Sequence, residues 1–432
     1  MVFNFKSFSK SEKRVLAYIS LLYFLFLFFR FLSENYFLAD SYEYLEIAKS
    51  INNFTYFENT LNVELTTKRP FIYPFFLSFF LNISILFILV IQTFVSCFSV
   101  FVFFKILKKL EIKISNLLIV ILFFTPSIFI YSQLIMSEWI VLLLLNILTL
   151  VLLEPFSKRN FIIIQLITVL LAFTKPVFYP FIYINFLFFA YYLFKTKTFS
   201  LWLFFPIIIL QLYILHNEQE SGFRHFSSIE NHNLINYNLY YFKSSKTGKV
   251  EADKWHKNVY DNKNYIGRNF KEQNVYLKKV GVSEIRENFF SYSFYHFKTA
   301  IRGVFDPGRF DIMTFFNKED GKQGFLEILN GNKSLKSLFK EKMIIIILFI
   351  IPIFFINIIK YFYFVKYILK NKHSNLIWYL FILLAYNILV SGPVNSSRYM
   401  MPFQIIVICF ALKEFQKNLQ HTSNRQTVSD RQ

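Results

Sequence analysis

ISILFILVIQTFVSCFSVFVFF, residues 83–104, is the stretch that decides the fold. It holds 22 residues without one acidic or basic side chain. A helix of about 20 apolar residues crosses the hydrocarbon core of a bilayer. Inside that core a backbone must satisfy its own hydrogen bonds, which leaves helices and closed barrels as the spanning structures. Barrel strands alternate polar and apolar residues, and this stretch does not, so it predicts a membrane-spanning helix.

The rest of the chain repeats this pattern. Its 432 residues are 55% hydrophobic and include 60 Phe but only 10 Gly, a composition that excludes an ordinary soluble domain. Apolar runs with few or no charges are predicted to span the membrane at residues 15–32, 83–104, 117–130, 139–153, 161–173, 177–193, 201–215, 343–359, 376–390 and 401–412. We therefore predict an all-α polytopic membrane protein with about ten transmembrane helices, extracytoplasmic juxtamembrane helices and one long extracytoplasmic loop.

Much of the Lys and Arg lies in short clusters at the ends of the apolar runs, although the long 216–342 segment is also rich in basic residues, and the formal net charge is +20. Cytoplasmic loops of membrane proteins are rich in Lys and Arg. With ten spans, one orientation places both termini and the 105–113, 154–159, 195–199 and 360–372 loops in the cytoplasm. We interpret the charge as topology signals and contact with membrane lipids, and predict no nucleic-acid partner. The Phe-, Ile-, Asn- and Lys-rich composition is typical of an AT-rich genome, so we expect a bacterial plasma membrane.

These patterns divide the chain into four parts. Residues 1–215 are predicted to form an N-terminal transmembrane module, whose first loop, 33–82, carries the candidate catalytic residue. Residues 216–342 form an extracytoplasmic loop region, 343–415 the C-terminal transmembrane helices, and 416–432 a disordered cytoplasmic tail.

One helix of the outer segment is predicted to touch the membrane. It covers residues 283–305 and carries an aromatic surface of Phe289, Phe290, Phe294, Tyr295 and Phe297. Aromatic, basic helices next to membrane spans typically lie at the bilayer interface.

The polar residues that suit chemistry all fall on the predicted outer side. They occur in LADSYEYLEIAKSI (38–51), KRPFIYP (68–74), SEW (137–139), TKP (174–176) and NSSRYMMP (395–402). Charged residues at membrane boundaries that share one face are candidates for function. With the predicted topology, these five stretches can meet at one extracytoplasmic rim.

The first stretch has a structural alternative. Asp40 and Glu43 have the D-x-x-E spacing of a capping box, which begins a helix without any chemistry. Helical spacing places Asp40 above the apolar stripe that contains Tyr44, because the two are four residues apart. The same spacing predicts that Glu43 and Glu46 face water.

The other charged candidates also have structural alternatives. Arg69 and Arg398 can anchor spans at lipid head groups, and Lys175 can reach the head groups from a short turn. Glu138 can favour the start of a helix through the helix dipole.

No metal site is predicted from the residues. Cys97 and Cys409 lie inside apolar runs without the spacing of metal ligands, and the histidines show no ligand spacing either. We predict no certain cofactor and leave a divalent cation open.

Together the outer residues suit a substrate with a lipid-linked phosphate. Cations bind the phosphate, and one carboxylate activates a hydroxyl group. Phosphate is a good leaving group that needs charge stabilisation and no proton donor, so one carboxylate suffices where a glycosidase needs two.

The order of these motifs resembles the polytopic type-C glycosyltransferases that use polyprenyl-phosphate-linked sugars. The branch concerned contains the bacterial aminoarabinose transferases of lipid A and the protein O-mannosyltransferases. The matching motifs are Asp40 with Tyr44 and Ala48, Arg69-Pro70 with Tyr73-Pro74, Ser137-Glu138, Thr174-Lys175-Pro176, and Arg398-Tyr399 with Pro402. The chain departs from the family at Ser41, where members often have a second acid, and at Phe71, where they have a second proline.

The resemblance implies transfer of a sugar, with inversion, from a polyprenyl-phosphate sugar to a hydroxyl of a glycan, lipid or protein acceptor. It implies that Asp40 is the base or orients the acceptor. Arg69, Lys175 and Arg398 are then the candidates that bind the donor phosphate. The candidate substrate-binding residues are Tyr44, Tyr73, Glu138 and Tyr399.

Two other functions fit parts of the sequence. A polymerase of O-antigen or capsule also has many spans and one long outer loop, and would use basic residues of that loop such as Arg302 or Arg309. A lipid-linked sugar flippase or transporter would need ionisable residues within spans and broken helices in paired halves.

Overall fold

The computed structural model describes residues 8–56, 63–315, 344–371 and 374–429. All regular secondary structure within these residues is helical, which confirms the predicted all-α class. Five helical segments of the described chain are long and apolar enough to cross a membrane, or six if one bent pair is a single span. The five are α1 (Lys10–Ser33), α5 (Ile85–Lys109), Pro176–Lys195, Phe349–Lys370 and Ile377–Val394. The chain therefore has the helices of a membrane protein.

Further helices lie between these segments. Before residue 222 they are α2 (Ala39–Asn52), α3 (Val63–Thr66), α4 (Ile72–Ser78), α6 (Asn116–Phe123), α7 (Ser127–Ile130), η2 (Tyr131–Gln133), α8 (Glu138–Leu152), α9 (Lys158–Thr174), η3 (Pro176–Phe178), α10 (Phe181–Lys195), η4 (Leu201–Leu203) and α11 (Phe205–Ser221). The segment that follows contains α12 (Ile229–Asn233), the π-helix η5 (Leu234–Leu239), α13 (Tyr240–Thr247), α14 (Lys249–Tyr260), α15 (Phe270–Glu287), α16 (Phe289–Val304) and α17 (Arg309–Phe315). The last part contains α19 (Ile344–Lys370), α20 (Asn375–Ser391), η8 (Gly392–Val394), α21 (Ser397–Met400), η9 (Met401–Phe403) and α22 (Gln404–Ser429).

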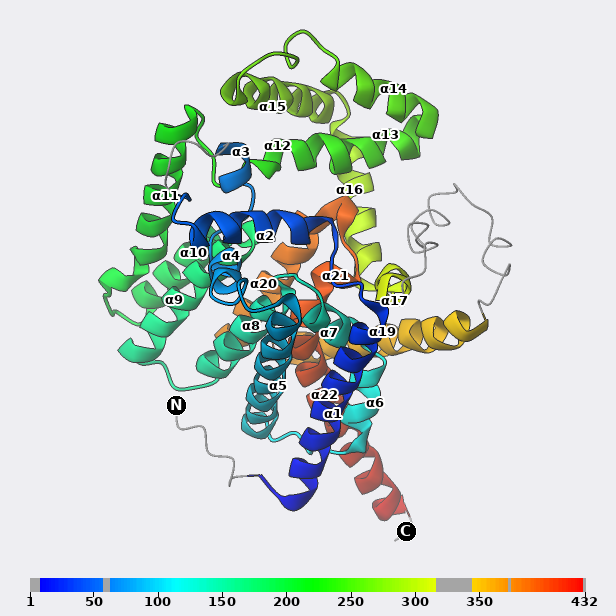
Figure 1. The fold of residues 1–432 in the computed structure, drawn as a ribbon. Helices are drawn as coiled ribbons and strands as arrows, with labels where there is room; N and C mark the ends of the chain where they lie inside the picture. The colour runs from blue at the N-terminus through cyan, green and yellow to red at the C-terminus, as the bar shows by residue number, and fades with distance from the viewer. Residues whose placement is uncertain (1–7, 57–62, 316–343, 372–373, 430–432) are drawn as a thin grey trace.

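Figure 1 shows how these helices are arranged. α1, α5 and α22 run toward one end of the molecule, and α2 lies across the other end of α1 and α5. α2 packs against α4, and a separate layer made of α13, α14 and α15 lies beyond α2. The beginning of α1 and the end of α22 lie far from that layer.

The ten predicted spans fall on helices, but several helices are short or broken. α6 and the α7–η2 segment are bent by 73° with respect to each other. The bend lies at Pro126, whose missing N–H cannot continue a helical hydrogen-bond ladder. α8 has 15 residues and α9 has 17, fewer than the roughly 20 that cross a bilayer without tilt or thinning. Helix length alone therefore supports five or six crossings in the described chain.

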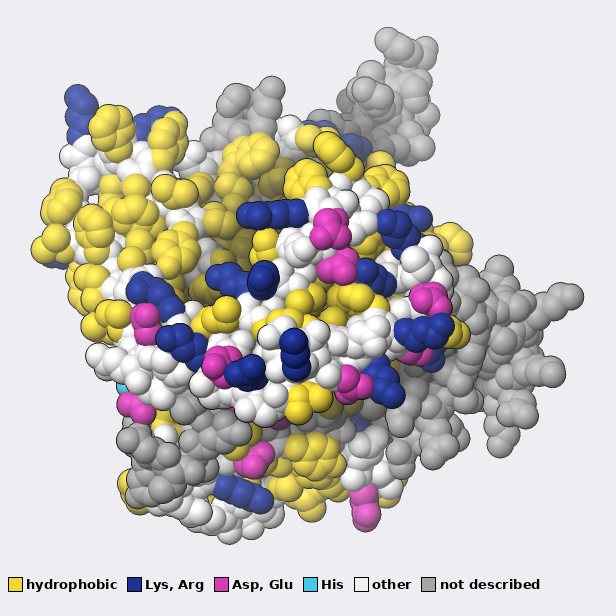
Figure 2. Space-filling model, turned by 90° about the horizontal axis from the view of Figure 1, so that it is seen from above, with side chains coloured by type: hydrophobic (Ala, Val, Ile, Leu, Met, Phe, Trp, Pro, Cys, Tyr) yellow, Lys and Arg dark blue, Asp and Glu magenta, His cyan; other side chains and the backbone are white. Residues whose placement is uncertain are grey.

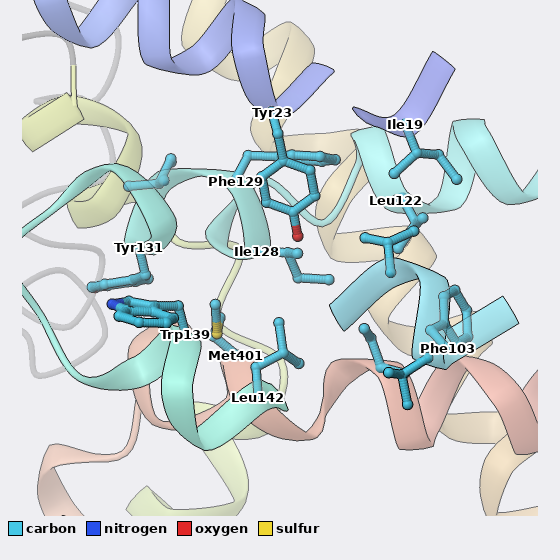
Figure 3. Packing of buried hydrophobic residues seen from close by; sticks show 14 of the residues in the cluster. Ile19, Tyr23, Phe103, Leu122, Ile128, Phe129, Tyr131, Trp139, Leu142 and Met401 are labelled. Carbon is cyan, nitrogen blue, oxygen red and sulfur yellow. The ribbon is translucent and has the colours of Figure 1, made fainter. Parts of the chain in front are cut away.

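Aromatic and aliphatic side chains together form the core between α1, α5, α7 and α8 (Figure 3). Tyr23 of α1 lies against Phe129 of α7, with ring centroids 4.7 Å apart. Phe103 of α5, Trp139 of α8 and Met401 of η9 are buried in the same cluster. Within a bilayer, close packing holds helices together where the hydrophobic effect cannot. This packing fixes the positions from which the site residues project.

The layer made of α13, α14 and α15 has a small core of its own, so this segment is more regular than its sequence suggests. Its buried side chains are Ile235, Leu239, Phe242, Val259, Leu277 and Tyr292. Seen from above, charged side chains of both signs are spread over the face of the molecule that carries this layer (Figure 2). Of the predicted loop region 216–342, residues 316–342 lie outside the described part of the chain.

The predicted helix over residues 283–305 is helical in the structure as far as Val304, but Asn288 divides it between two helices. α15 ends at Glu287 and α16 begins at Phe289. Asn288 separates them because its side-chain amide donates a hydrogen bond to the Glu284 carbonyl at 3.0 Å, which competes with a continuing helix. Phe290 and Phe294 are 86% and 70% exposed, so α16 does present an aromatic surface.

The predicted disordered tail over 416–432 differs from the structure as far as residue 429. α22 continues to Ser429. Residues 413–429 contain neither Pro nor Gly, so a helix that has begun at Gln404 can propagate through them. Residues 430–432 lie outside the described part.

Candidate functional site

Asp40 lies in the first turn of α2, which begins one residue earlier at Ala39. The N-cap position is Leu38, and its N–H donates to the Ser41 hydroxyl at 2.9 Å. The capping-box alternative for Asp40 and Glu43 is therefore wrong, because neither residue occupies the N-cap. Both carboxylates bind side chains from distant segments.

The Asp40 carboxylate binds two guanidinium groups. Its Oδ1 lies 2.8 Å from Nη2 of Arg69, and its Oδ2 accepts a hydrogen bond from Nη2 of Arg398. Burial acts to raise the pKa of Asp40, but Arg398 and Arg69 outweigh it and hold that pKa well below its usual range. Asp40 is therefore ionised at neutral pH, and it is a weak base while both guanidinium groups hold it.

Glu138 is the second carboxylate bound to Arg398. It opens α8 and is fully buried. Its Oε1 lies 2.6 Å from Nε of Arg398 and 3.0 Å from Nζ of Lys175. Burial lowers the pKa of the Lys175 amine, while Glu138 acts in the opposite direction. Arg398 therefore bridges Asp40 and Glu138, which come from different parts of the chain.

Glu43 also belongs to this cluster, contrary to the prediction that it faces water. Its two carboxylate oxygens lie 2.6 Å from Nε of Arg69 and 2.8 Å from Nζ of Lys68. Arg69 therefore holds Asp40 and Glu43 together on the first turns of α2. Glu46, by contrast, is exposed as predicted.

Tyrosine rings line the cluster. Lys175 Nζ lies 4.8 Å from the Tyr399 ring centroid, and the Arg69 guanidinium lies 5.5 Å from that of Tyr44. The Tyr44 hydroxyl hydrogen-bonds with the Ser137 hydroxyl at 3.0 Å, and burial raises the pKa of Tyr44 to about 12. The Tyr44 and Tyr73 rings meet edge to face at 4.8 Å. These tyrosines therefore stay neutral and act as polar aromatic walls.

The structure thus brings all eight predicted site residues into one connected cluster. Within the described chain, that cluster holds three carboxylates (Asp40, Glu43 and Glu138) and four cations (Lys68, Arg69, Lys175 and Arg398), one net positive charge. One polar atom is left over: Oε2 of Glu138 is buried and has no hydrogen-bond partner in the structure. A buried carboxylate oxygen without a donor is costly, so it is a place where a ligand hydroxyl would bind.

A neighbouring pair of acids was missed from the sequence. Asp306 Oδ2 accepts the Ser397 N–H at 3.0 Å, and Asp311 accepts hydrogen bonds from the Ser397 hydroxyl and, at 2.5 Å, from the Tyr131 hydroxyl. Burial and the nearby Asp306 raise the pKa of Asp311 to about 7. Because Ser397 precedes Arg398, the two acids fix the turn that presents Arg398. Asp306-Pro-Gly was visible in the sequence, but nothing there showed that it meets Ser397.

The residues of the cluster do not fit a divalent cation. Within the described residues, no group of three or more His, Cys, Asp and Glu side chains lies close enough to bind one metal ion. Asp40, Glu43 and Glu138 are each paired with Arg or Lys, so a divalent cation would have to displace these basic side chains to bind the carboxylates.

Comparisons of the chain with protein-family models, curated proteins and solved structures find no match. Function is therefore inferred from the geometry of the site.

Proposed function

We propose that this protein is an integral-membrane glycosyltransferase. It moves a sugar from a polyprenyl-phosphate donor to a hydroxyl of a lipid-linked glycan, lipid or protein, with inversion at the anomeric carbon. The observation that carries this proposal is the Asp40–Arg398–Glu138 bridge, with Arg69 and Lys175 beside it. Such a cluster places phosphate-binding cations in contact with one candidate base at the ends of apolar helices.

The charge of the cluster suits a donor with a single phosphate. A sugar linked through one phosphodiester brings one negative charge, which balances the one net positive charge. A pyrophosphate link, as used by a polymerase, would bring an excess of negative charge. Guanidinium groups form paired hydrogen bonds with phosphate as they do with carboxylate. Arg398 and Arg69 can therefore exchange a carboxylate partner for the donor phosphate.

This exchange also activates Asp40. Once the phosphate takes over part of Arg398 and Arg69, the carboxylate is less strongly stabilised and becomes a better base. The acceptor hydroxyl gives its proton to Asp40 and its oxygen bonds to the anomeric carbon. The bond from that carbon to the phosphate oxygen breaks, and polyprenyl phosphate leaves with the bonding electrons. Lys175, Arg69 and Arg398 stabilise its charge.

Glu138 has two roles in this scheme, one for each carboxylate oxygen. Oε1 orients Lys175 and Arg398, while the free Oε2 accepts a hydrogen bond from a hydroxyl of the sugar or acceptor. A site that supplies a buried acceptor selects ligands that carry the matching donor.

The proposal includes a topology of ten crossings with both termini in the cytoplasm and the site outside, in a bacterial plasma membrane. Basic residues at the ends of the apolar runs support this orientation. The arrangement in Figure 1, with the beginning of α1 and the end of α22 far from the polar layer, supports it too.

The test is transfer by Asp40→Asn in a strain from which the gene is deleted. Wild type should restore a sugar-sized mass on an envelope lipid or glycan, and Asp40→Asn should transfer at least ~10²-fold more slowly at equal membrane level. Glu46→Gln, on the exposed face of the same helix, is the matched control and should transfer normally. Unchanged transfer by Asp40→Asn would contradict the base assignment. Loss of product only with Arg302 or Arg309 changes would favour a polymerase.

A further inference from the structure

The loop that carries Arg69 has little regular structure of its own. Arg69 lies between α3 and α4, outside either helix, and Pro70 follows it without an N–H to donate. α3 is a single turn of four residues, and so short a helix is not stable by its own hydrogen bonds. Local structure alone therefore determines the position of Arg69 only weakly.

Two consecutive serines from a distant part of the chain hold this loop. They lie in the connection between α11 and α12. The Ser228 hydroxyl donates to the Glu64 carbonyl at 2.7 Å, and the Ser227 hydroxyl donates to the Lys68 carbonyl at 2.8 Å. The Ser228 N–H donates to the Thr67 carbonyl at 3.2 Å. All three carbonyls belong to the short turn that leads to the arginine.

The connection that carries the two serines is itself fixed. Ser227 and Ser228 are 1% and 2% exposed. The side-chain amide of Asn217, on α11, donates to the carbonyls of His225 and Phe226, each at 3.2 Å. Because the serines are buried and the backbone before them is tied to α11, they form a rigid support for the loop.

This support matters most after the donor has bound, if the proposed function holds. In the free protein, Arg69 is also held by its ion pairs with Asp40 and Glu43. The donor phosphate would take over part of the guanidinium from these carboxylates, which weakens that hold. The bonds from the serines go to the backbone of the loop, so the phosphate does not compete for them.

We propose that Ser227 and Ser228 are positioning residues that keep Arg69 in place to bind the donor phosphate. This inference rests on the proposed function, and it assigns the connection between α11 and α12 a part in that reaction. The serines act through Arg69 and not on the reacting atoms. A charged group displaced by about 1 Å can cost a positioned reaction ~10²-fold in rate, so the support has a measurable effect.

The test is a double-mutant cycle between the serines and Arg69, measured as sugar transfer at equal membrane level. Ser227→Ala combined with Ser228→Ala removes both hydroxyl bonds and should slow transfer about tenfold. In an Arg69→Gln background the same pair of changes should slow transfer by less than about twofold, because the group that the serines position is gone. Ser291→Ala is the matched control and should change transfer in neither background. It removes an exposed hydroxyl of α16 that donates to the Asn288 carbonyl at 3.0 Å.

Hydrogen exchange of the purified protein in neutral detergent gives a readout that needs no sugar transfer. In the double serine variant, the amides of residues 64–69 should exchange about tenfold faster than in wild type, and those of α5 at the wild-type rate. The proposal is overturned if exchange at 64–69 is unchanged, or if it rises equally in α5, as expected of a general loss of stability. It is also overturned if the serine changes slow transfer equally with and without Arg69, or not at all. If wild type transfers no sugar, the proposed function fails, and exchange still decides whether the serines hold the loop.

Discussion

Arg398 is the residue on which the two sides of the candidate site depend. Its Nε binds Glu138 and its Nη2 binds Asp40, which precede it by 260 and 358 residues. A planar fork with fixed donors can hold two carboxylates in a set geometry. The acids and cations of this site therefore control one another's position and charge.

Arg398→Lys should separate charge from geometry. An ammonium group cannot hold Asp40 and Glu138 together, so we expect sugar transfer to fall by ~10²-fold or more while the protein still folds. Arg398→Gln leaves Glu138 with Lys175 alone and should cost about 3 kcal/mol of stability, because breaking a buried pair strands a charge.

Thermal unfolding and transfer assays on the same preparations distinguish these effects. Arg159→Gln, an exposed arginine at the start of α9, is the control. Equal transfer by Arg398→Lys and wild type would show that the fork has no part in the reaction.

At the scale of helices, the sequence predicts where elements lie better than what their side chains contact. Helix positions followed from apolar runs. The contacts of Glu43 did not, because helical spacing places it on a polar face and cannot show that Arg69 and Lys68 cover that face. The break between α6 and α7 could have been read from Pro126. The contact between α17 and α21 could not be predicted, because it joins Asp311 to Ser397, which are 86 residues apart in the chain.

Asp311 gives the contact between α17 and α21 a pH dependence. Its pKa is raised to about 7, so between about pH 4 and pH 7 the folded protein holds a proton that the unfolded chain has lost. Stability should therefore fall as the pH rises through this range, by up to ~4 kcal/mol at about 1.4 kcal/mol per pH unit. The charged and titratable groups around it are Tyr131, Asp306 and Arg398.

Asp311→Asn should remove most of this dependence. Unfolding midpoints measured between about pH 5 and pH 8 should decline less in the variant than in wild type. Glu46→Gln, an exposed acid, should keep the wild-type slope. Parallel slopes for Asp311→Asn and wild type would show that Asp311 is ionised in the folded protein throughout.

At the scale of the whole molecule, the candidate site is where the beginning and end of the chain meet. α2, α8 and α21 each contribute one member of the Asp40–Glu138–Arg398 bridge, and the packed core of Figure 3 supports them. Sequence motifs named these residues because each lies at the end of an apolar run. Their pairing could not be derived, since it spans most of the chain. The long-range contacts fix one arrangement of the helices, and the proposed function requires that the site face the side of the membrane where the proposed lipid-linked donor is presented.

The orientation of the molecule gives the last prediction. In a background with Cys97→Ala and Cys409→Ala, Lys254→Cys on α14 places a thiol on the outer layer, and Lys195→Cys places one at the end of α10. Both positions are exposed. A membrane-impermeant maleimide should label Lys254→Cys in intact cells, and should label Lys195→Cys only after permeabilisation, since short Lys-rich loops stay in the cytoplasm. The reverse pattern would place the Asp40–Arg398 cluster inside the cell, where an extracytoplasmic donor could not reach it.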